Sequence, residues 1–172
     1  MRVWVAGCST GEEVVSIAIA LREEGMLERT RIYATDMDTD VLSRARSGAF
    51  ALEKVPDYTR NYLAAGGVEA FSAYYTVTGD RAVFDADLLR EVVFAQHNLA
   101  TDRSFNEFHL IICRNVLIYF GRELQDRVLR LFDESLPRRG VLGLGRKETL
   151  RGTAIEDGYE PFLEAERIYR RS

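Results

Sequence analysis

The sequence predicts an α/β protein built on a doubly wound, mostly parallel sheet, and three observations carry that prediction. Short apolar runs recur along the chain, as expected of strands that are buried on both faces of a sheet. Stretches with apolar residues at helical spacing separate these runs. A turn of small residues, Gly7 to Gly11, joins the first apolar run directly to a helical stretch, as in ligand-binding α/β folds.

The first unit is a strand over residues 3–6, the glycine turn, and a helix that we expect to end near Gly25. Such a turn lets backbone N–H groups approach a ligand closely. Glu12 and Glu13 follow it and would repel a triphosphate or a pyrophosphate. Neither a Walker ending nor a GxGxxG fingerprint is present. The turn therefore favours a ligand with a cationic end, the alternative being that both carboxylates only complement the helix dipole.

The second unit places an acidic residue at the tip of a strand. Residues 30–35 read as this strand, Asp36 follows it, and Asp38 caps a helix over residues 39–47. In doubly wound folds an acid at this position accepts hydrogen bonds from ribose hydroxyls. We therefore favour ribose binding for Asp36 over a plain turn or cap.

An antiparallel element interrupts the alternation. A short helix over residues 56–64 ends at Gly66-Gly67, and the aromatic and β-branched run from Phe71 to Phe84 turns at Gly79-Asp80. This pattern predicts an inserted β-hairpin. The hairpin is either a cover of no special function or an exposed strand edge that accepts a partner peptide.

Polar residues follow two later strands. Asn98 comes after the strand at 92–95, where its amide can read a purine edge or simply form a turn. Arg114 and Asn115 come directly after the most apolar strand, at the rim where such sheets bind ligands. The remaining predicted elements are helices at 86–90 and 122–136, a strand at 141–144, and an antiparallel pair at 159–162 and 165–169.

Composition excludes several classes of protein. The 172 residues are 47% hydrophobic and 29% charged with a net charge of -4, so no basic surface points to nucleic acid. No apolar segment reaches membrane-spanning length and no signal-like leader opens the chain, so we expect a cytoplasmic protein without membrane insertion. Two cysteines and two histidines predict neither a disulfide framework nor a metal site.

Taken together, these residues resemble one family, the CheR glutamate methyltransferases that modify chemoreceptors in bacterial chemotaxis. The resemblance is carried in the right order by Ala6-Gly-Cys-Ser-Thr-Gly-Glu-Glu13, Ala34-Thr-Asp-Met-Asp-Thr-Asp-Val-Leu42, Asn98-Leu99 and, most specifically, Cys113-Arg-Asn-Val-Leu-Ile-Tyr-Phe120. It implies a class I S-adenosylmethionine (SAM) methyltransferase sheet, which is Rossmann-like, over residues 1–172, with a small antiparallel β-subdomain inserted at about 68–92. Members usually carry an N-terminal helical domain, which we expect to be absent here.

The resemblance also implies site residues. Glu12 corresponds to the acid that binds the methionyl part of SAM, and Asp36 to the acid that binds the ribose. Asn98 and Leu99 correspond to the adenine subsite, and Tyr119 lies beside the reacting centre. The full implied cofactor set is Gly7, Ser9, Thr10, Glu12, Asp36, Asn98, Leu99, Arg114 and Asn115. We further hypothesise that Tyr119 and Arg114 are catalytic and orient the acceptor carboxylate. The alternative is that Arg114 pairs with a local carboxylate and Tyr119 packs its ring.

The implied reaction transfers the SAM methyl group to glutamate side chains in the cytoplasmic helical region of chemoreceptors, giving methyl esters and S-adenosylhomocysteine (SAH). A receptor C-terminal peptide is a further expected partner, at the β-subdomain. We expect methyl transfer to depend on the missing helical domain more than SAM binding does, and Gly145-Arg-Lys-Glu148 stands where many relatives have Gly-His-Ser-Glu. One alternative is a regulatory or interaction module that binds SAM or SAH without turnover. A nicotinamide-dependent oxidoreductase is a third possibility, which Glu12 and Glu13 oppose.

Overall fold

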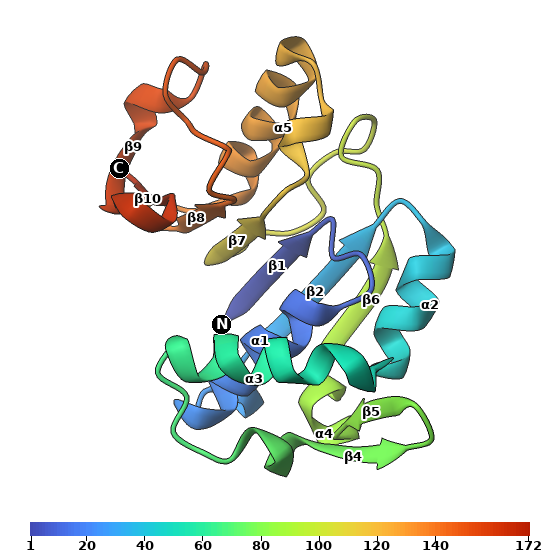
Figure 1. The fold of residues 1–172 in the computed structure, drawn as a ribbon. Coiled ribbons are helices and arrows are strands. Elements are labelled where there is room, and N and C mark those ends of the chain that lie inside the picture. Colours follow the sequence, from blue (N-terminus) through green and yellow to red (C-terminus); the bar gives the residue numbers. More distant parts are fainter.

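A computed structural model describes residues 1–172 and contains a seven-stranded sheet (Figure 1). The strands lie in the order β6-β2-β1-β7-β8-β10-β9. Their bounds are β1 Arg2–Ala6, β2 Arg31–Asp36, β6 Val92–Gln96, β7 Leu110–Cys113, β8 Val141–Leu144, β9 Tyr159–Leu163 and β10 Ile168–Arg171. Apart from β10, which runs antiparallel to both its neighbours, the paired strands are parallel. The predicted doubly wound sheet is confirmed.

The sheet reverses its winding at β1. From β1 the chain moves outward through β2 to β6, then returns to β7 on the other side of β1 and continues to β8. The loops after β1 and β7 therefore leave neighbouring strands in opposite directions. This reversal is where doubly wound sheets bind their ligands, outside the carboxyl ends of the strands.

The helices begin and end close to the predicted positions. They are α1 Glu12–Glu23, α2 Thr39–Ser47, α3 Val55–Ala64, α4 Ala86–Leu89 and α5 Arg122–Ser135. Asp38 is the N-cap of α2, and its Oδ1 accepts hydrogen bonds from the amides of Asp40 at 2.8 Å and Val41 at 3.3 Å. Two orphan amides at the start of the helix are thereby satisfied.

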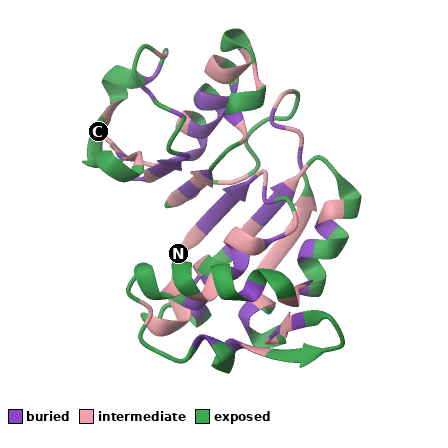
Figure 2. Ribbon diagram, viewed as in Figure 1, coloured by how far each residue is buried: buried purple, intermediate pink, exposed green.

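Alternation along β1 divides the core between the two faces of the sheet. Val3 and Val5 pack in a cluster with the apolar face of α1, whereas Trp4 and Ala6 pack in a second cluster with α5. Trp4 is fully buried, and its Nε1 donates to Thr35 Oγ1 at 2.8 Å, so its one polar atom is satisfied. Figure 2 shows the resulting buried centre of the sheet under exposed helices.

A second, three-stranded sheet lies below the main one. Strands β3 (Ala49–Ala51), β4 (Tyr75–Thr78) and β5 (Arg81–Phe84) are antiparallel in the order β3-β5-β4, so the predicted hairpin is present. Its first residues, Phe71–Tyr74, form a 3-10 turn instead of a strand, because Phe71 and Tyr74 are buried among other aromatic rings. The third strand, β3, was not predicted, and with it the small sheet starts at residue 49 and not near 68.

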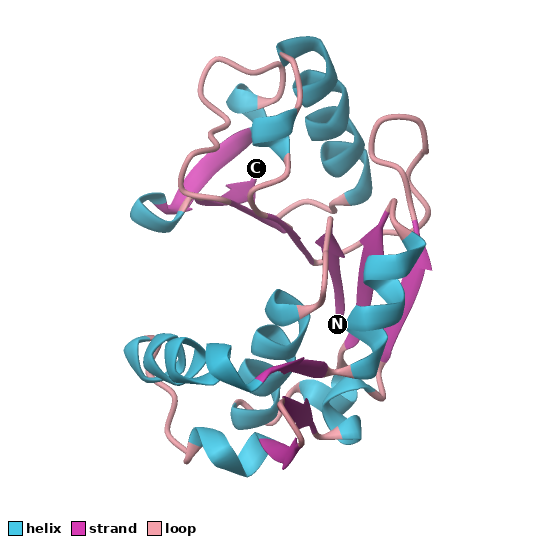
Figure 3. Cartoon of the chain, turned by 45° about the vertical axis from the view of Figure 1, so that its right-hand side comes forward, coloured by secondary structure: helices cyan, strands magenta, loops and turns pink.

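The two ends of the molecule are formed by different elements (Figure 1). Both views place the C-terminal strands at the upper end of the molecule and α3 with the small sheet at the lower end (Figure 1, Figure 3).

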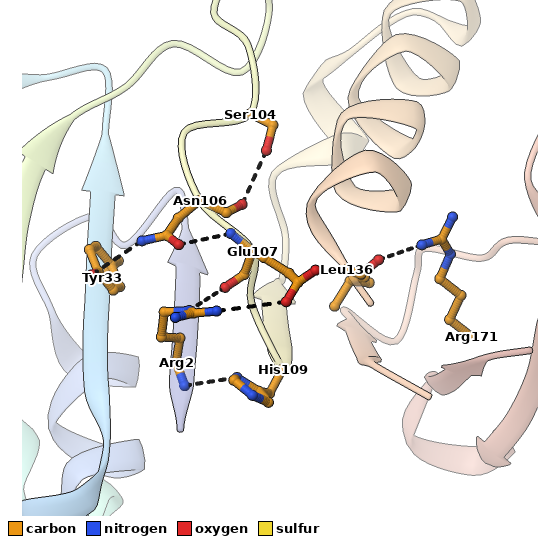
Figure 4. A network of polar contacts seen from close by, with 8 residues as sticks. All are labelled: Arg2, Tyr33, Ser104, Asn106, Glu107, His109, Leu136 and Arg171. Atoms are coloured by element: carbon orange, nitrogen blue, oxygen red, sulfur yellow. Dashed lines mark hydrogen bonds and ion pairs between the residues drawn. The ribbon is translucent and has the colours of Figure 1, made fainter. Parts of the chain in front are cut away.

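Polar contacts hold the loop before β7 to the central strands (Figure 4). Asn106 Nδ2 donates to Tyr33 Oη at 3.3 Å, and the Arg2 guanidinium lies 3.7 Å from Glu107 Oε1. None of the helices has the length and apolar character needed to cross a membrane.

A cluster of two tyrosines and one carboxylate joins α3 and the 3-10 turn before β4 to α1. The hydroxyls of Tyr62 on α3 and Tyr74 both donate to Glu23 Oε1, Tyr74 at 2.8 Å. These two hydrogen bonds hold the pKa of the Glu23 carboxyl below its ordinary value near 4.5, and the bond from Tyr62 has the larger effect. The ionised form is therefore favoured by folding.

We expect this cluster to make stability depend on pH. Because the pKa of Glu23 is lower in the folded chain, its contribution to stability is present above the ordinary pKa of 4.5 and is lost as the pH falls through the folded pKa. Glu23→Gln should therefore lower the urea midpoint at pH 7, with a smaller difference from the parent chain at pH 3. Urea titrations at both pH values measure this. Glu24→Gln, an exposed neighbour, is the control, and an equal Glu23→Gln effect at both pH values would contradict the expectation.

Candidate cofactor and methyl-transfer site

The glycine turn is built for close approach. The amides of Gly7 and Cys8 both donate to Thr35 O, at 2.8 and 2.9 Å, which ties the turn to the end of β2. Gly7 has φ +73°, and a Cβ there would lie 2.5 Å from Val116 Cγ2. The loops after β1 and β7 thus meet at Gly7, where neither the backbone conformation nor the space admits a side chain.

Asp36 is the last residue of β2 and lines the cleft. Its Oδ2 accepts from the Ser9 amide at 2.9 Å and its Oδ1 from the Asp38 amide at 3.1 Å. The carboxylate therefore also acts as a turn residue, the alternative that the sequence left open. Each carboxylate oxygen has a second lone-pair site, so the same group can still accept from ribose hydroxyls.

The carboxylates of the first helical turn have different partners. Glu12 accepts from Thr10 Oγ1 at 2.5 Å and from the Tyr58 hydroxyl at 3.4 Å, with Lys54 Nζ 3.8 Å away. Burial and the Glu12 charge raise the pKa of Tyr58 to about 12, so its hydroxyl stays protonated and donates. Tyr58 was not predicted. Asn61 lies one turn further along the same helix and also lines the cleft. This polar i, i+3 pair on one helix face is the only sequence signal for Tyr58.

Glu13 is paired with the predicted catalytic arginine. Its Oε1 lies 2.8 Å from Arg114 Nη1, with half of the Arg114 side chain exposed. The pair joins the start of α1 to the loop after β7. Arg114 therefore pairs with a local carboxylate, which is the alternative that the sequence left open for it. Its role toward an acceptor carboxylate stays a prediction.

The segment after β6 forms a tight turn. Asn98 Oδ1 accepts from the Ala100 amide at 2.9 Å, and the Asn98 amide donates to Asp102 Oδ2 at 2.9 Å. The hydrogen bond from the Asn98 amide is the largest cause of the lowered pKa of the Asp102 carboxyl. Asn98 and the buried Leu99 both line the cleft. The turn-forming role of Asn98 is thus visible, and adenine contact stays a prediction for both residues.

The loop after β7 carries the rest of the predicted site. Asn115 has φ +59°, and Leu117–Tyr119 form a 3-10 turn that leaves Tyr119 80% exposed at the mouth of the cleft. Glu148, in the loop after β8, is buried and accepts hydrogen bonds from this loop. Glu148 was not predicted as a site residue, because its three partners in the β7 loop lie more than 30 residues away in sequence.

These loops enclose one cleft of about 1480 Å³, larger than the roughly 300–1,000 Å³ of typical small-molecule pockets. Its lining includes apolar residues of β7, β8 and β10. It also includes three carboxylates, which we call the acidic rim (Glu12, Glu13 and Asp36), and the guanidinium groups of Arg114 and Arg146. The cleft brings together eight of the nine predicted cofactor residues and Tyr119; Thr10 is the one outside its lining. Nowhere in the chain do three or more His, Cys, Asp or Glu side chains gather as a metal site would require.

Comparison with known proteins identifies the family. The domain described as "CheR methyltransferase, SAM binding domain" matches residues 1–161. The chain belongs to the CheR methyltransferase family. It is 52% identical over 172 residues to Cher3 of Pseudomonas putida, covering 100% of this chain and 63% of that protein. It is 34% identical over 167 residues to the chemotaxis protein methyltransferase of Escherichia coli, covering 90% of this chain and 57% of that protein.

This CheR domain spans between half and two thirds of the length of those relatives. Solved structures agree on the fold alone. The SAM-dependent methyltransferase SibL, in its apo form, matches 84% of this chain and 30% of its own with a TM-score of 0.51 at 14% identity. PKMT2 from Rickettsia typhi, in complex with AdoHcy, matches 83% and 20% with a TM-score of 0.50 at 14% identity. The class I SAM methyltransferase fold predicted from the sequence is confirmed.

SAM is the cofactor of the CheR family, and the residues present fit it. SAM carries an ammonium, a carboxylate and a ribose but no phosphate. Asp36 retains lone pairs for ribose hydroxyls, and the acidic rim complements a ligand with cationic groups.

Proposed function

We propose that this CheR domain methylates glutamate side chains in the cytoplasmic helical region of chemoreceptors. Bound SAM supplies an activated methyl group on its sulfonium, and the products are a glutamate methyl ester and SAH. The observation that carries the proposal is that the acidic wall formed by Glu12 and Asp36 and the exposed Tyr119 share one cleft. That cleft is larger than a small-molecule site and therefore leaves room for a protein side chain beside a cofactor.

The chain's own residues need only position the acceptor. A glutamate side chain has a reference pKa near 4.3 and is already ionised at neutral pH, so no general base is required. We assign its orientation to the Tyr119 hydroxyl and to the N–H groups of Arg114 that Glu13 leaves free. Neither cysteine of the chain supplies a nucleophile, because burial raises the pKa of Cys8 to about 12 and that of Cys113 well above its ordinary value.

A base-labile methyl ester assay tests the proposal. The chain is incubated with labelled SAM and a chemoreceptor cytoplasmic fragment, and the label released by alkali is counted. A fragment with its acceptor glutamates replaced by alanine is the control. Label that appears only on the parent fragment supports the proposal.

The same assay, run with calorimetric titrations of SAM, SAH and NAD, separates the alternatives. SAM binding without ester formation would favour a non-catalytic SAM- or SAH-binding module. The ion pair between Arg114 and Glu13 favours this non-catalytic module, because it already engages the predicted catalytic arginine. NAD binding in place of SAM would contradict both the methyltransferase and the SAM-binding module. The carboxylates of Glu12 and Asp36 in the cleft oppose NAD binding, because they would repel its pyrophosphate.

For a second partner we propose a receptor C-terminal peptide at the small sheet. β4 is an edge strand, and Thr76, Val77 and Thr78 on it are exposed, so its free backbone groups can pair with an added strand. We expect titration with such a peptide to shift the amide resonances of β4 and to spare those of β6. Shifts confined to other surfaces would contradict this placement.

A further inference from the structure

A single buried carboxylate joins the loops after β7 and β8. Glu148 is only 5% exposed, and its partners are backbone amides. Oε1 accepts from Val116 at 3.0 Å and Leu117 at 2.8 Å, while Oε2 accepts from Asn115 at 3.1 Å and Gly145 at 2.6 Å. Burying a charge is costly unless hydrogen bonds replace its hydration, and four amides do so here.

Three of those amides are consecutive and belong to the loop that presents Tyr119. Asn115 holds φ +59°, a conformation that residues with side chains seldom adopt, and this turns the amides of residues 115–117 toward one point. Converging amides of this kind form an anion-binding nest. Without an anion the three N–H groups would face one another unpaired, so the conformation of the loop depends on the carboxylate that fills the nest.

Gly145 is part of the same arrangement. A Cβ at this position would lie 2.7 Å from Glu148 Oε2 and 2.9 Å from the Asn115 amide nitrogen. The two loops therefore approach so closely that no side chain fits between them. The spacing of Gly145 and Glu148 lets one short segment donate an amide to the carboxylate and also supply that carboxylate.

We propose that Glu148 is the positioning residue of methyl transfer. Its carboxylate holds the loop from Arg114 to Tyr119 in the shape that brings Asn115 and Tyr119 to the cleft. Because it also fills the nest, the backbone amides of the loop are not open to the acceptor carboxylate, which side chains must then orient. This assignment rests on the proposed function.

Glu148→Gln separates this role from simple packing. Each carboxylate oxygen serves two amides, so whichever oxygen becomes NH2, two N–H groups face a donor. We expect hydrogen exchange at the amides of 115, 116, 117 and 145 to accelerate while exchange in β1 and β2 stays unchanged. Loss of loop geometry should lower kcat on the order of 100-fold, with a smaller fall in SAH affinity.

Three further variants make the result decisive. Glu148→Asp keeps the charge on a shorter stem and should recover part of both the amide protection and kcat. Gly145→Ala should reproduce the local loss by forcing the loops apart. Glu164→Gln is the matched control, an exposed carboxylate whose nearest cation, Arg151, lies 4.0 Å away, and it should behave as the parent chain.

Two results would overturn the assignment: parental exchange and kcat in Glu148→Gln, or uniformly faster exchange that the aspartate variant does not recover. If the parent chain itself forms no ester, the proposed function fails, whereas amide exchange and SAH affinity still decide whether Glu148 holds the loop.

Discussion

Replacing Tyr119 by phenylalanine is expected to remove most methyl transfer while leaving SAM affinity close to that of the parent chain. Tyr119 is 80% exposed at the cleft, and its hydroxyl makes no hydrogen bond within the chain. The hydroxyl therefore has no role in the fold and is free to donate to an acceptor carboxylate. A hydrogen bond to a charged group contributes about 1.5–3 kcal/mol, which corresponds to roughly a 10- to 150-fold loss of kcat.

Single-turnover ester formation with a receptor fragment measures this effect, and calorimetry with SAH measures cofactor affinity. Tyr75→Phe is the matched control, because it makes the same change on β4, in the small sheet and outside the cleft. Parental turnover in Tyr119→Phe would remove Tyr119 from the reaction. A parallel fall in SAH affinity would assign it to cofactor binding.

Local signals were enough to predict the main sheet and most helices. The helix Thr39–Ser47 has its predicted ends because Asp38, directly before it, satisfies its first amides. Apolar runs such as Val3–Ala6 are buried on both faces of the sheet, and strands in that setting have continuous apolar sequences. In these segments propensity, pattern and tertiary burial agree.

The departures occur where contacts distant in sequence decide the structure. β3 has three residues and owes its strand geometry to pairing with β5 about 30 positions later, so no local pattern marks it. Phe71 and Tyr74 are typical strand residues, yet their rings are buried in an aromatic cluster that a 3-10 turn accommodates.

The candidate site divides in the same way. Residues in loops directly after strands, such as Asp36 and Arg114, could be placed at the rim from chain order alone, because parallel strands share one carboxyl edge. Tyr58 lies on a helix and not after a strand, so this rule does not place it at the site. Glu148 does follow β8, but chain order does not show that its partners are the amides of the β7 loop. Their contacts with Glu12 and with the β7 loop exist only in three dimensions.

Asp36→Ala is expected to weaken SAM binding by roughly 1–3 kcal/mol, the cost of leaving buried polar groups unpaired. That range corresponds to about a 5- to 150-fold rise in Kd. Two losses add here. Ribose hydroxyls would lose their acceptor, and the Ser9 amide, held at 2.9 Å by Asp36, would be released together with the turn that lines the cleft.

Calorimetric titration with SAM and SAH measures the change, and Asp38→Ala supplies the control. Asp38 caps α2 two residues away and is not part of the cleft lining, so its replacement should cost about 0.5–2 kcal/mol of stability and leave SAM affinity intact. Affinity lost equally in both variants would mean that the turn matters and the ribose contact does not. Unchanged affinity in Asp36→Ala would refute ribose binding by this residue, and the acidic strand tip would then be only the turn former that the sequence also allowed.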